Sequence, residues 1–355
     1  MLEQILETYP QTTYNPQELN TLLTLLFKHN KKHLDNFLKE YGIPYSYDKP
    51  KLRELVKDHV VANKLTFDEL VGLLNKIEGW GKQQIYLYKA PDHISRLWQD
   101  ESRVRNLLEQ ADVGDLFNQS RSLILPDHPT LTSIDWTAQN VRFVWIEKRP
   151  WRERVPGEDK NENQSRENPE LKGDPILVWD AYRVNYSRSL IVFDWNFITN
   201  DAMLLIQRVH NGRENYVSIR DRFEAELSNI IDMNSFEKVR LSYGLRLIEK
   251  SDETRRHKMT FQSIANRGKI AVASPNRHDD VFEDEVIEGI QVVLGDRVAG
   301  LLGNFYWFPV DGQLSCEVYT LIYGSKAEDQ RIGILAAHKE QDIRYVLSRI
   351  RHYCR

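Results

Sequence analysis

The chain has 355 residues, of which 41% are hydrophobic and 28% charged, and its formal net charge is −4. This composition is typical of a folded globular protein with room for two domains. It excludes a basic body, so any nucleic-acid surface has to be a local patch.

The termini and the cysteines bear on the compartment. The N-terminal residues lack a signal-peptide pattern, and no window approaches the ~18 apolar residues of a membrane span. Cys316 and Cys354 are too few and too isolated for a disulfide framework or a Cys-rich metal site, which fits a reducing compartment. We expect a soluble intracellular protein, in the cytoplasm or nucleoid or in the nucleus.

Residues 1–91 are predicted to form a helical domain. Asn15 and Pro16 have the pattern of a helix cap and first helical position, and Thr66-x-x-Glu69 is a capping box before another apolar pattern. Short helices in so few residues indicate a small antiparallel bundle of the death-fold or SAP-like kind. The expected helices cover 15–30, 31–42, 48–64 and 66–89.

Residues 92–135 are predicted to be a helical connector, and residues 136–355 an α+β domain with a mainly antiparallel sheet. Strand patterns rich in β-branched and aromatic residues cover 140–151, 174–195, 236–250 and 258–275. Helical patterns cover 201–211, 216–232, 283–296 and 340–355. The polar, charged stretch 152–173 predicts a long solvated loop.

Motifs for catalysis are missing. The stretch "GWGKQQ" lacks the strand and hydroxyl residue of a phosphate-binding loop, and the histidines show no metal-ligand spacing. The acidic run at 278–289 either holds a divalent cation or gathers carboxylates at a helix N-terminus, and we favour the second interpretation. The candidate cation ligands are Asp279, Asp280, Glu283 and Asp284. We therefore predict no catalytic residue, cofactor or metal, with a metal-dependent nuclease built from dispersed carboxylates as the lowest-ranked alternative.

Local positive charge is the remaining signal. Lys49, Arg53 and Lys57 recur every fourth residue, and Lys51 is close by. Such a row on one helix face is able to contact successive phosphates. The alternative is a solvated helix face balanced by neighbouring acidic residues.

Lys82, Arg152 and Arg154 are three further candidates for phosphate contacts. Lys82 follows Trp80 in a glycine-flanked stretch, where Trp80 either is exposed or plugs the bundle. Arg152 and Arg154 are expected in the loop beside Trp151.

Arg220 and Arg222 fall in the first turns of a predicted helix, where the helix dipole disfavours cations. They are expected either to pair with Glu224 and Glu226 one turn later or to bind an external phosphate.

The order of segments resembles the centromere protein N family of kinetochore subunits. The resemblance rests on "DKPKLRELVKDHV", "GKQQIYLYK", "VRFVWIEKRPW…PILVWDAYRVNYSRSLIVF" and "SIRDRF". It implies a pyrin-like helical domain, a linker region and a curved sheet. It also implies DNA-contacting roles for Lys49, Lys51, Arg53, Lys82, Arg220 and Arg222, without a counterpart of the family's histone-reading residues.

We therefore expect a non-enzymatic protein that grips double-stranded DNA by its phosphates, in a basic groove between the two domains. The alternative is a death-fold adaptor or scaffold that recruits a protein without nucleic acid. The apolar segment 304–324 and the helix at 340–352 are candidates for a protein partner or self-association, although a core strand and a core-facing helix explain them equally well.

Overall fold

The structure is a computed structural model of the whole chain. It describes residues 15–27, 34, 37–39, 41–44, 48–119, 123, 126–154, 160–161, 178–179, 182–208, 215–263, 268–283, 285, 287, 289, 298–324, 329–336 and 338–355. Its helices are α1 (Pro16–Leu26), α3 (Lys49–Val61), α4 (Phe67–Gly79), α5 (Asp92–Leu97), α6 (Glu101–Gln110), α7 (Tyr216–Leu227), α8 (Leu241–Glu249) and α10 (Glu340–Tyr353), with 3-10 turns at Gly114–Leu116 and Met233–Ser235.

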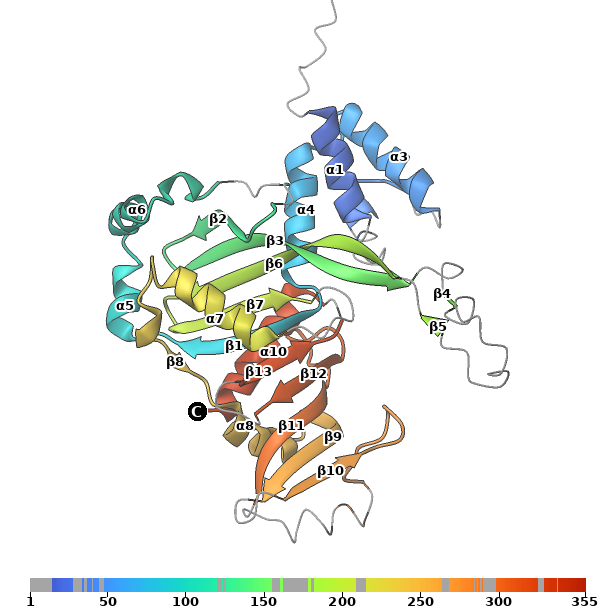
Figure 1. The fold of residues 1–355 in the computed structure, drawn as a ribbon, viewed down its shortest axis with the longest axis vertical. Helices are drawn as coiled ribbons and strands as arrows, with labels where there is room; N and C mark the ends of the chain where they lie inside the picture. The colour runs from blue at the N-terminus through green and yellow to red at the C-terminus, as the bar shows by residue number, and fades with distance from the viewer. Residues whose placement is uncertain are drawn as a thin grey trace, which may run out of the picture.

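The strands form one large sheet and a separate two-stranded sheet, β4 with β5. The strands are β1 (Gln83–Lys89), β2 (Thr130–Trp136), β3 (Asn140–Arg154), β4 (Lys160–Asn161), β5 (Val178–Trp179), β6 (Tyr182–Asn196), β7 (Asp201–Gln207), β8 (Glu237–Lys238), β9 (Thr254–Ser263), β10 (Lys269–Ala273), β11 (Val298–Trp307), β12 (Val318–Tyr323) and β13 (Arg331–Ile334). The large sheet has eleven strands in the order β10-β9-β11-β12-β13-β1-β7-β6-β3-β2, with β8 paired to β1 (Figure 1). Its strand pairs are antiparallel, which confirms the mixed helix and strand content and the mainly antiparallel sheet.

The helices α1, α3 and α4 share a leucine-rich core near the N-terminus. The Asn15 side chain accepts a hydrogen bond from the Gln17 amide at 2.9 Å, and the predicted capping box of Thr66 and Glu69 is present. The helices predicted at 15–30 and 48–64 are thus confirmed in substance. The one predicted at 31–42 falls largely outside the described residues, and the death-fold arrangement stays a prediction.

Residues 83–89 were predicted to continue a helix, and this was wrong. Helix α4 ends at Gly79, and residues 83–89 form β1 between β7 and β13, near the middle of the sheet. Every residue from Gln83 to Tyr88 is buried. A strand covered on both faces loses the polar–apolar alternation of a half-exposed strand, so its apolar run resembles a buried helix.

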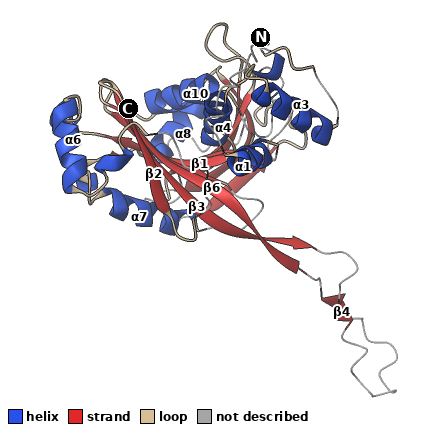
Figure 2. Ribbon diagram, turned by 90° about the horizontal axis from the view of Figure 1, so that it is seen from above, coloured by secondary structure: helices blue, strands red, loops and turns tan. Residues whose placement is uncertain are grey.

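Helices cover both faces of the sheet (Figure 2). Along β1, Ile85 and Leu87 join a core with α8 and α10, whereas Tyr86 and Tyr88 join a core with α5, α6 and α7. We call these the α10 face and the α7 face. Because successive side chains of a strand point to opposite faces, one strand serves both cores.

The bundle of α1, α3 and α4 lies on the α10 face. Trp80, directly after α4, belongs to the core of that face, and Glu78 of α4 forms an ion pair with Arg188 of β6 at 3.5 Å. Figure 2 shows the bundle helices on the same side of the sheet as α10. Trp80 therefore packs into the core of the sheet. The sequence had predicted that it is either exposed or packed inside the helical bundle.

Two more elements differ from expectation. Residues 201–207, predicted helical, form β7, where all but the end positions are buried. Residues 241–249, predicted as a strand, form α8, whose Leu241, Leu245 and Ile248 are buried on one stripe. The strands predicted at 140–151, 174–195 and 258–275 and the final helix are confirmed in β3, β6, β9, β10 and α10. The loop predicted at 152–173 and the helix predicted at 283–296 fall mostly outside the described residues.

The apolar C-terminal elements are used by the protein's own core. Ile343, Val346, Leu347 and Ile350 of α10 are buried against the sheet, together with Phe305 of β11. This favours the core explanation of 304–324 and 340–352 over a partner surface. Among the described residues, no helix is long and apolar enough to cross a bilayer.

Candidate nucleic-acid interface

Helix α3 carries the first predicted basic cluster. Leu52, Val56 and Val60 bury one stripe of this helix, and this leaves Lys49, Lys51 and Lys57 exposed on the remaining faces. The predicted basic residues therefore lie on a helix, and its three lysines are exposed. They are exposed because the apolar stripe turns the other side of the helix into the core.

The four cations of α3 have different surroundings. Arg53 reaches across to α1, where it donates to the Asn20 carbonyl at 3.1 Å and to the Thr24 hydroxyl at 3.0 Å. Lys49 donates to the Phe27 carbonyl at 3.1 Å. Lys57 lies 3.8 Å from Glu54, an exposed pair that contributes little to stability. Arg53 and Lys49 are therefore partly committed to contacts with α1 and its C-cap, and Lys51 and Lys57 are the more accessible charges.

Lys82 lies in the short connection between α4 and β1. Its side chain is exposed, and its carbonyl accepts a hydrogen bond from the Arg208 amide at 2.8 Å. That backbone contact fixes Lys82 at the junction of the bundle and the sheet.

Arg152 and Arg154 are strand residues, which corrects the expectation that they belong to the loop. They are the end of β3, in register with Val184 and Tyr182 of β6. Strands β3 and β6 pair over fifteen residues each, from Asn140 to Arg154 on β3.

The far part of this hairpin is a two-stranded ribbon. Among the described residues, β2 pairs with β3 only as far as Ile146, and β7 pairs with β6 only from Ile191 onward. Residues 147–154 and 182–189, which we call the β3–β6 ribbon, thus project beyond the sheet (Figures 1 and 2).

The β3–β6 ribbon is a basic segment of the chain. It holds six arginine and lysine residues against two glutamates, a net charge of +4 in a chain whose net charge is −4. Tyr186 and Val184 are 52% and 53% exposed, and the Lys148 ammonium lies 4.5 Å from the centre of the Tyr186 ring. The basic residues of the ribbon are Lys148, Arg149, Arg152, Arg154, Arg183 and Arg188.

Ion pairs hold the base of the ribbon to its surroundings. Arg149 pairs with Glu147 and donates to the Gln207 carbonyl at 3.1 Å. Arg188 is buried beside Glu78; burial lowers the pKa of Arg188, and the carboxylate opposes this shift. These arginines connect the ribbon to β7 and α4, so the ribbon's direction is set by buried contacts.

The two arginines of α7 have partners inside the protein. Arg220 is buried, lies 2.5 Å from Asp221 and 3.4 Å from Glu224, and faces the Tyr86 ring. Burial opposes its charge, but the Asp221 hydrogen bond and the Glu224 charge outweigh burial and raise the pKa of Arg220 above its usual value.

Arg222 pairs with Glu147 of β3 at 2.5 Å. The expected helical pair between Arg220 and Glu224 is present, whereas Arg222 pairs across to the sheet in place of the expected Glu226. The Asn215 side chain caps the helix by accepting from the Ser218 amide at 3.2 Å.

The predicted residues do not all lie together. Helix α7 packs on the α7 face through Phe223 and Leu227, whereas α4 and the bundle lie on the α10 face. The sheet therefore separates Arg220 and Arg222 from Lys49, Lys51, Arg53 and Lys57. Lys82 lies at the junction, and Arg152 and Arg154 lie on the ribbon.

The acidic run at 278–289 has a structural use at Asp280. This buried carboxylate accepts from the Arg256 guanidinium at 2.7 Å and from the Phe282 amide at 2.8 Å. Within the described residues, no group of three or more His, Cys, Asp or Glu residues has the geometry to hold a metal ion.

Sequence reasoning overlooked Lys148 and Tyr186. The signal was available, because basic residues recur in both "IEKRPWRER" and "YRVNYSRS", which pair as neighbouring strands. The sequence did not show that β3 and β6 continue to pair with each other beyond the points where β2 and β7 stop. Comparison with protein-family models and with curated proteins found no match to this chain.

Proposed function

We propose that this protein binds double-stranded DNA through its phosphates, without enzymatic chemistry. The single observation that carries the proposal is the β3–β6 ribbon, a projecting two-stranded element. Its own residues have a net charge of +4, and Glu78 and Asp127, which pair with Arg188 and Lys148 from outside the ribbon, offset part of that charge. A two-stranded β-ribbon fits the major groove of B-DNA, and arginine and lysine supply the phosphate contacts.

The exposed lysines of α3 and Lys82 extend this surface. They belong to the bundle and its junction with the sheet, on the face of the sheet opposite to α7. The proposal leaves out Arg220, which has its counter-charges within the protein, and Arg222, which is bound to Glu147. The DNA would then contact the ribbon and the bundle, and no groove that includes α7 is needed.

The resemblance to the centromere protein N family points in the same direction. Membership of that family is part of this proposal, and its support is the order of segments and the basic stretches in α3 and before β1. The charge argument is independent of the resemblance, because it rests on the register of β3 with β6.

The first test is fluorescence anisotropy with a 20-base-pair random duplex, measured across a salt series. The logarithm of the binding constant should fall steeply with the logarithm of salt concentration, by ~0.9 for each phosphate contact. For the Arg152→Ala/Arg154→Ala variant we expect weaker binding and a slope shallower by about two contacts. A Lys51→Ala/Lys57→Ala variant should show the same direction of change for the bundle.

The matched control is Arg96→Ala/Arg103→Ala. These exposed arginines on α5 and α6 lie at the edge of the molecule away from the ribbon (Figure 1), and their loss should leave binding unchanged. The proposal fails if wild type does not bind at low salt, or if the ribbon variant binds like the control. Salt-independent self-association without DNA binding would support the adaptor alternative, and cleavage of plasmid with magnesium would support the nuclease.

A further inference from the structure

A thiol, an imidazole and a carboxylate meet at the end of α10 that faces the turn between β11 and β12. The Cys316 sulfur lies 3.6 Å from Nδ1 of His338 and 3.8 Å from Oδ2 of Asp342. Cys316 is exposed, His338 is half-buried and Asp342 is buried. None of these residues has a part in the DNA-binding proposal.

The carboxylate of Asp342 fixes the turn against the helix. It accepts from the Ser315 amide at 2.7 Å and from the Ser315 hydroxyl at 2.8 Å. Because Cys316 follows Ser315 directly, these two hydrogen bonds also set the position of the thiol.

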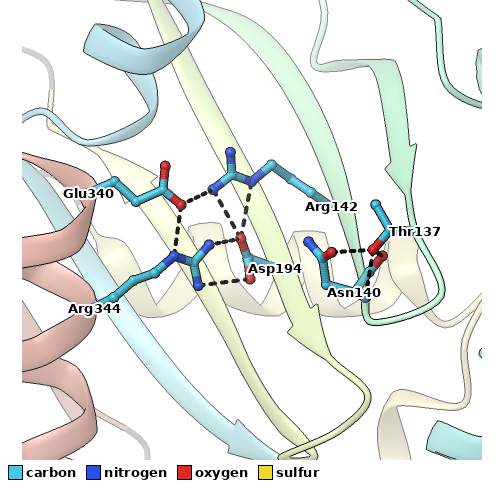
Figure 3. Close-up of polar contacts among 6 residues, drawn as sticks. All are labelled: Thr137, Asn140, Arg142, Asp194, Glu340 and Arg344. Carbon is cyan, nitrogen blue, oxygen red and sulfur yellow. Dashed lines mark hydrogen bonds and ion pairs between the residues drawn. The ribbon is translucent and has the colours of Figure 1, made fainter.

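The start of α10 is in turn fixed on the sheet. Figure 3 shows Arg142 of β3 and Arg344 of α10 both pointing to Asp194 of β6, with Glu340 between the two arginines. Arg344 lies 2.8 Å from Asp194 and 2.7 Å from Glu340, and Arg142 lies 3.0 Å from Asp194. His338 comes just before this anchored turn, so the pair of thiol and imidazole rests on a fixed frame.

We propose that Cys316 is a site of covalent modification by electrophiles and hydroperoxides, with His338 as the base that takes its proton. A nucleophile and its base within hydrogen-bonding reach, at an accessible position, are the requirements for such a thiol. The charge of Asp342 has two effects: it opposes a thiolate beside it, and it stabilises the imidazolium that forms when the proton moves.

The chemistry balances with one named co-reactant. In the reaction with a hydroperoxide, the sulfur forms a bond to one peroxide oxygen and the O–O bond breaks. The sulfur is oxidised by two electrons to a sulfenic acid, and the leaving oxygen takes a proton from the His338 imidazolium. With iodoacetamide, the S–C bond forms, the C–I bond breaks and iodide leaves.

Cys354 provides an internal comparison. It lies at the end of α10, half-buried against α8, and burial raises its pKa to about 11. Among the described residues, no hydrogen bond joins its sulfur to an imidazole. Its thiolate is therefore scarce at neutral pH, and it should react far more slowly than Cys316.

The experiment is alkylation of the folded full-length protein with iodoacetamide, followed by mass spectrometry of the two cysteine peptides between pH 5.5 and 9. A free thiol is only about 3% thiolate at pH 7, so proton removal by His338 should speed Cys316 roughly tenfold over its rate in His338→Gln. The matched control His128→Gln, at an exposed histidine elsewhere, should react like wild type. Dimedone trapping after hydrogen peroxide treatment should label Cys316 in wild type.

Two results would overturn the proposal. One is equal reaction rates for Cys316 and Cys354 in the folded wild type. The other is a Cys316 rate whose pH profile matches that of N-acetylcysteine. The second result needs no variant, so it remains decisive if His338→Gln fails to fold.

Discussion

At the scale of single residues, the two arginines of α7 pair with carboxylates of the same chain. Helix α7 begins at Tyr216, so Arg220 and Arg222 lie beyond the first turn, where the helix dipole disfavours cations most. Each is paired with a carboxylate within 3.4 Å. Only part of this arrangement is local, since Glu147 comes from β3. Lys49, Lys51 and Lys57 of α3 differ because their side chains are exposed.

Glu226 of α7 gives a residue-scale prediction for pH dependence. Burial raises the pKa of Glu226 above its ordinary 4.5, and the Arg222 charge and the Trp145 hydrogen bond oppose this shift. A raised folded-state pKa contributes stability that is complete below pH 4.5 and is lost as the pH rises through the folded value. Glu226→Gln keeps an acceptor for Trp145, so it should raise the midpoint of urea unfolding at pH 7 and leave it unchanged at pH 4. The exposed Glu109→Gln should shift neither midpoint; a Glu226→Gln effect of equal size at both pH values would contradict the burial argument.

At the scale of elements, the β3–β6 ribbon and the α4–β1 segment position the candidate interface. The ribbon projects because its two neighbours, β2 and β7, stop pairing before it does. The α4–β1 segment joins the bundle to the sheet through Trp80 and the pair of Glu78 and Arg188. An interface that uses the ribbon and the α4–β1 segment therefore depends on the N-terminal cap of α4 and on its packing.

The capping box of α4 gives an element-scale prediction. The Glu69 carboxylate accepts from the Thr66 amide at 2.7 Å, and this hydrogen bond, with those from Tyr41 and the Thr66 hydroxyl, lowers the pKa of Glu69. Thr66→Ala should lower the free energy of unfolding by ~1 kcal/mol and speed amide exchange in residues 67–79. Thr21→Ala, at an exposed α1 position, should change the unfolding free energy by less than ~0.5 kcal/mol. Equal exchange in Thr66→Ala and wild type would show that packing alone begins the helix.

At the scale of the whole molecule, β1 makes the sheet continuous. It pairs with β7 on one side and β13 on the other, so it joins the half of the sheet that carries the ribbon to the half that carries α8. Its side chains enter both cores. The bundle and the sheet are therefore linked through a central strand and a packed tryptophan.

Two truncations test this role of β1. A chain of residues 78–355 keeps Glu78, Trp80 and β1, and we expect it to be soluble with a cooperative thermal transition. A chain of residues 92–355 lacks β1, which opens two unpaired strand edges in the middle of the sheet, and we expect aggregation. Circular dichroism and size-exclusion chromatography distinguish the outcomes. A folded, monomeric 92–355 chain would show that the two halves of the sheet are independent and that residues 1–91 separate as first predicted.

Local patterns determined several features of this protein without the structure. The composition, the caps at Asn15 and Thr66, the long strands of β3 and β6 and the final helix all depend on neighbours in the sequence. The exposed lysines of α3 followed from its apolar stripe. Helix α8 was also within reach, because its buried residues recur at helical spacing, but residues 236–250 were predicted to be a strand.

Only the tertiary structure decided the features that depend on distant segments. Strands β1 and β7 are buried by helices on both faces, so neither shows the alternation that identifies a strand. The partner of Arg222, the separation of α7 from the bundle by the sheet, and the pairing of Cys316 with His338 join residues remote in sequence. The ribbon itself is defined by where its neighbours end, which is a property of strand register and is invisible in either strand alone.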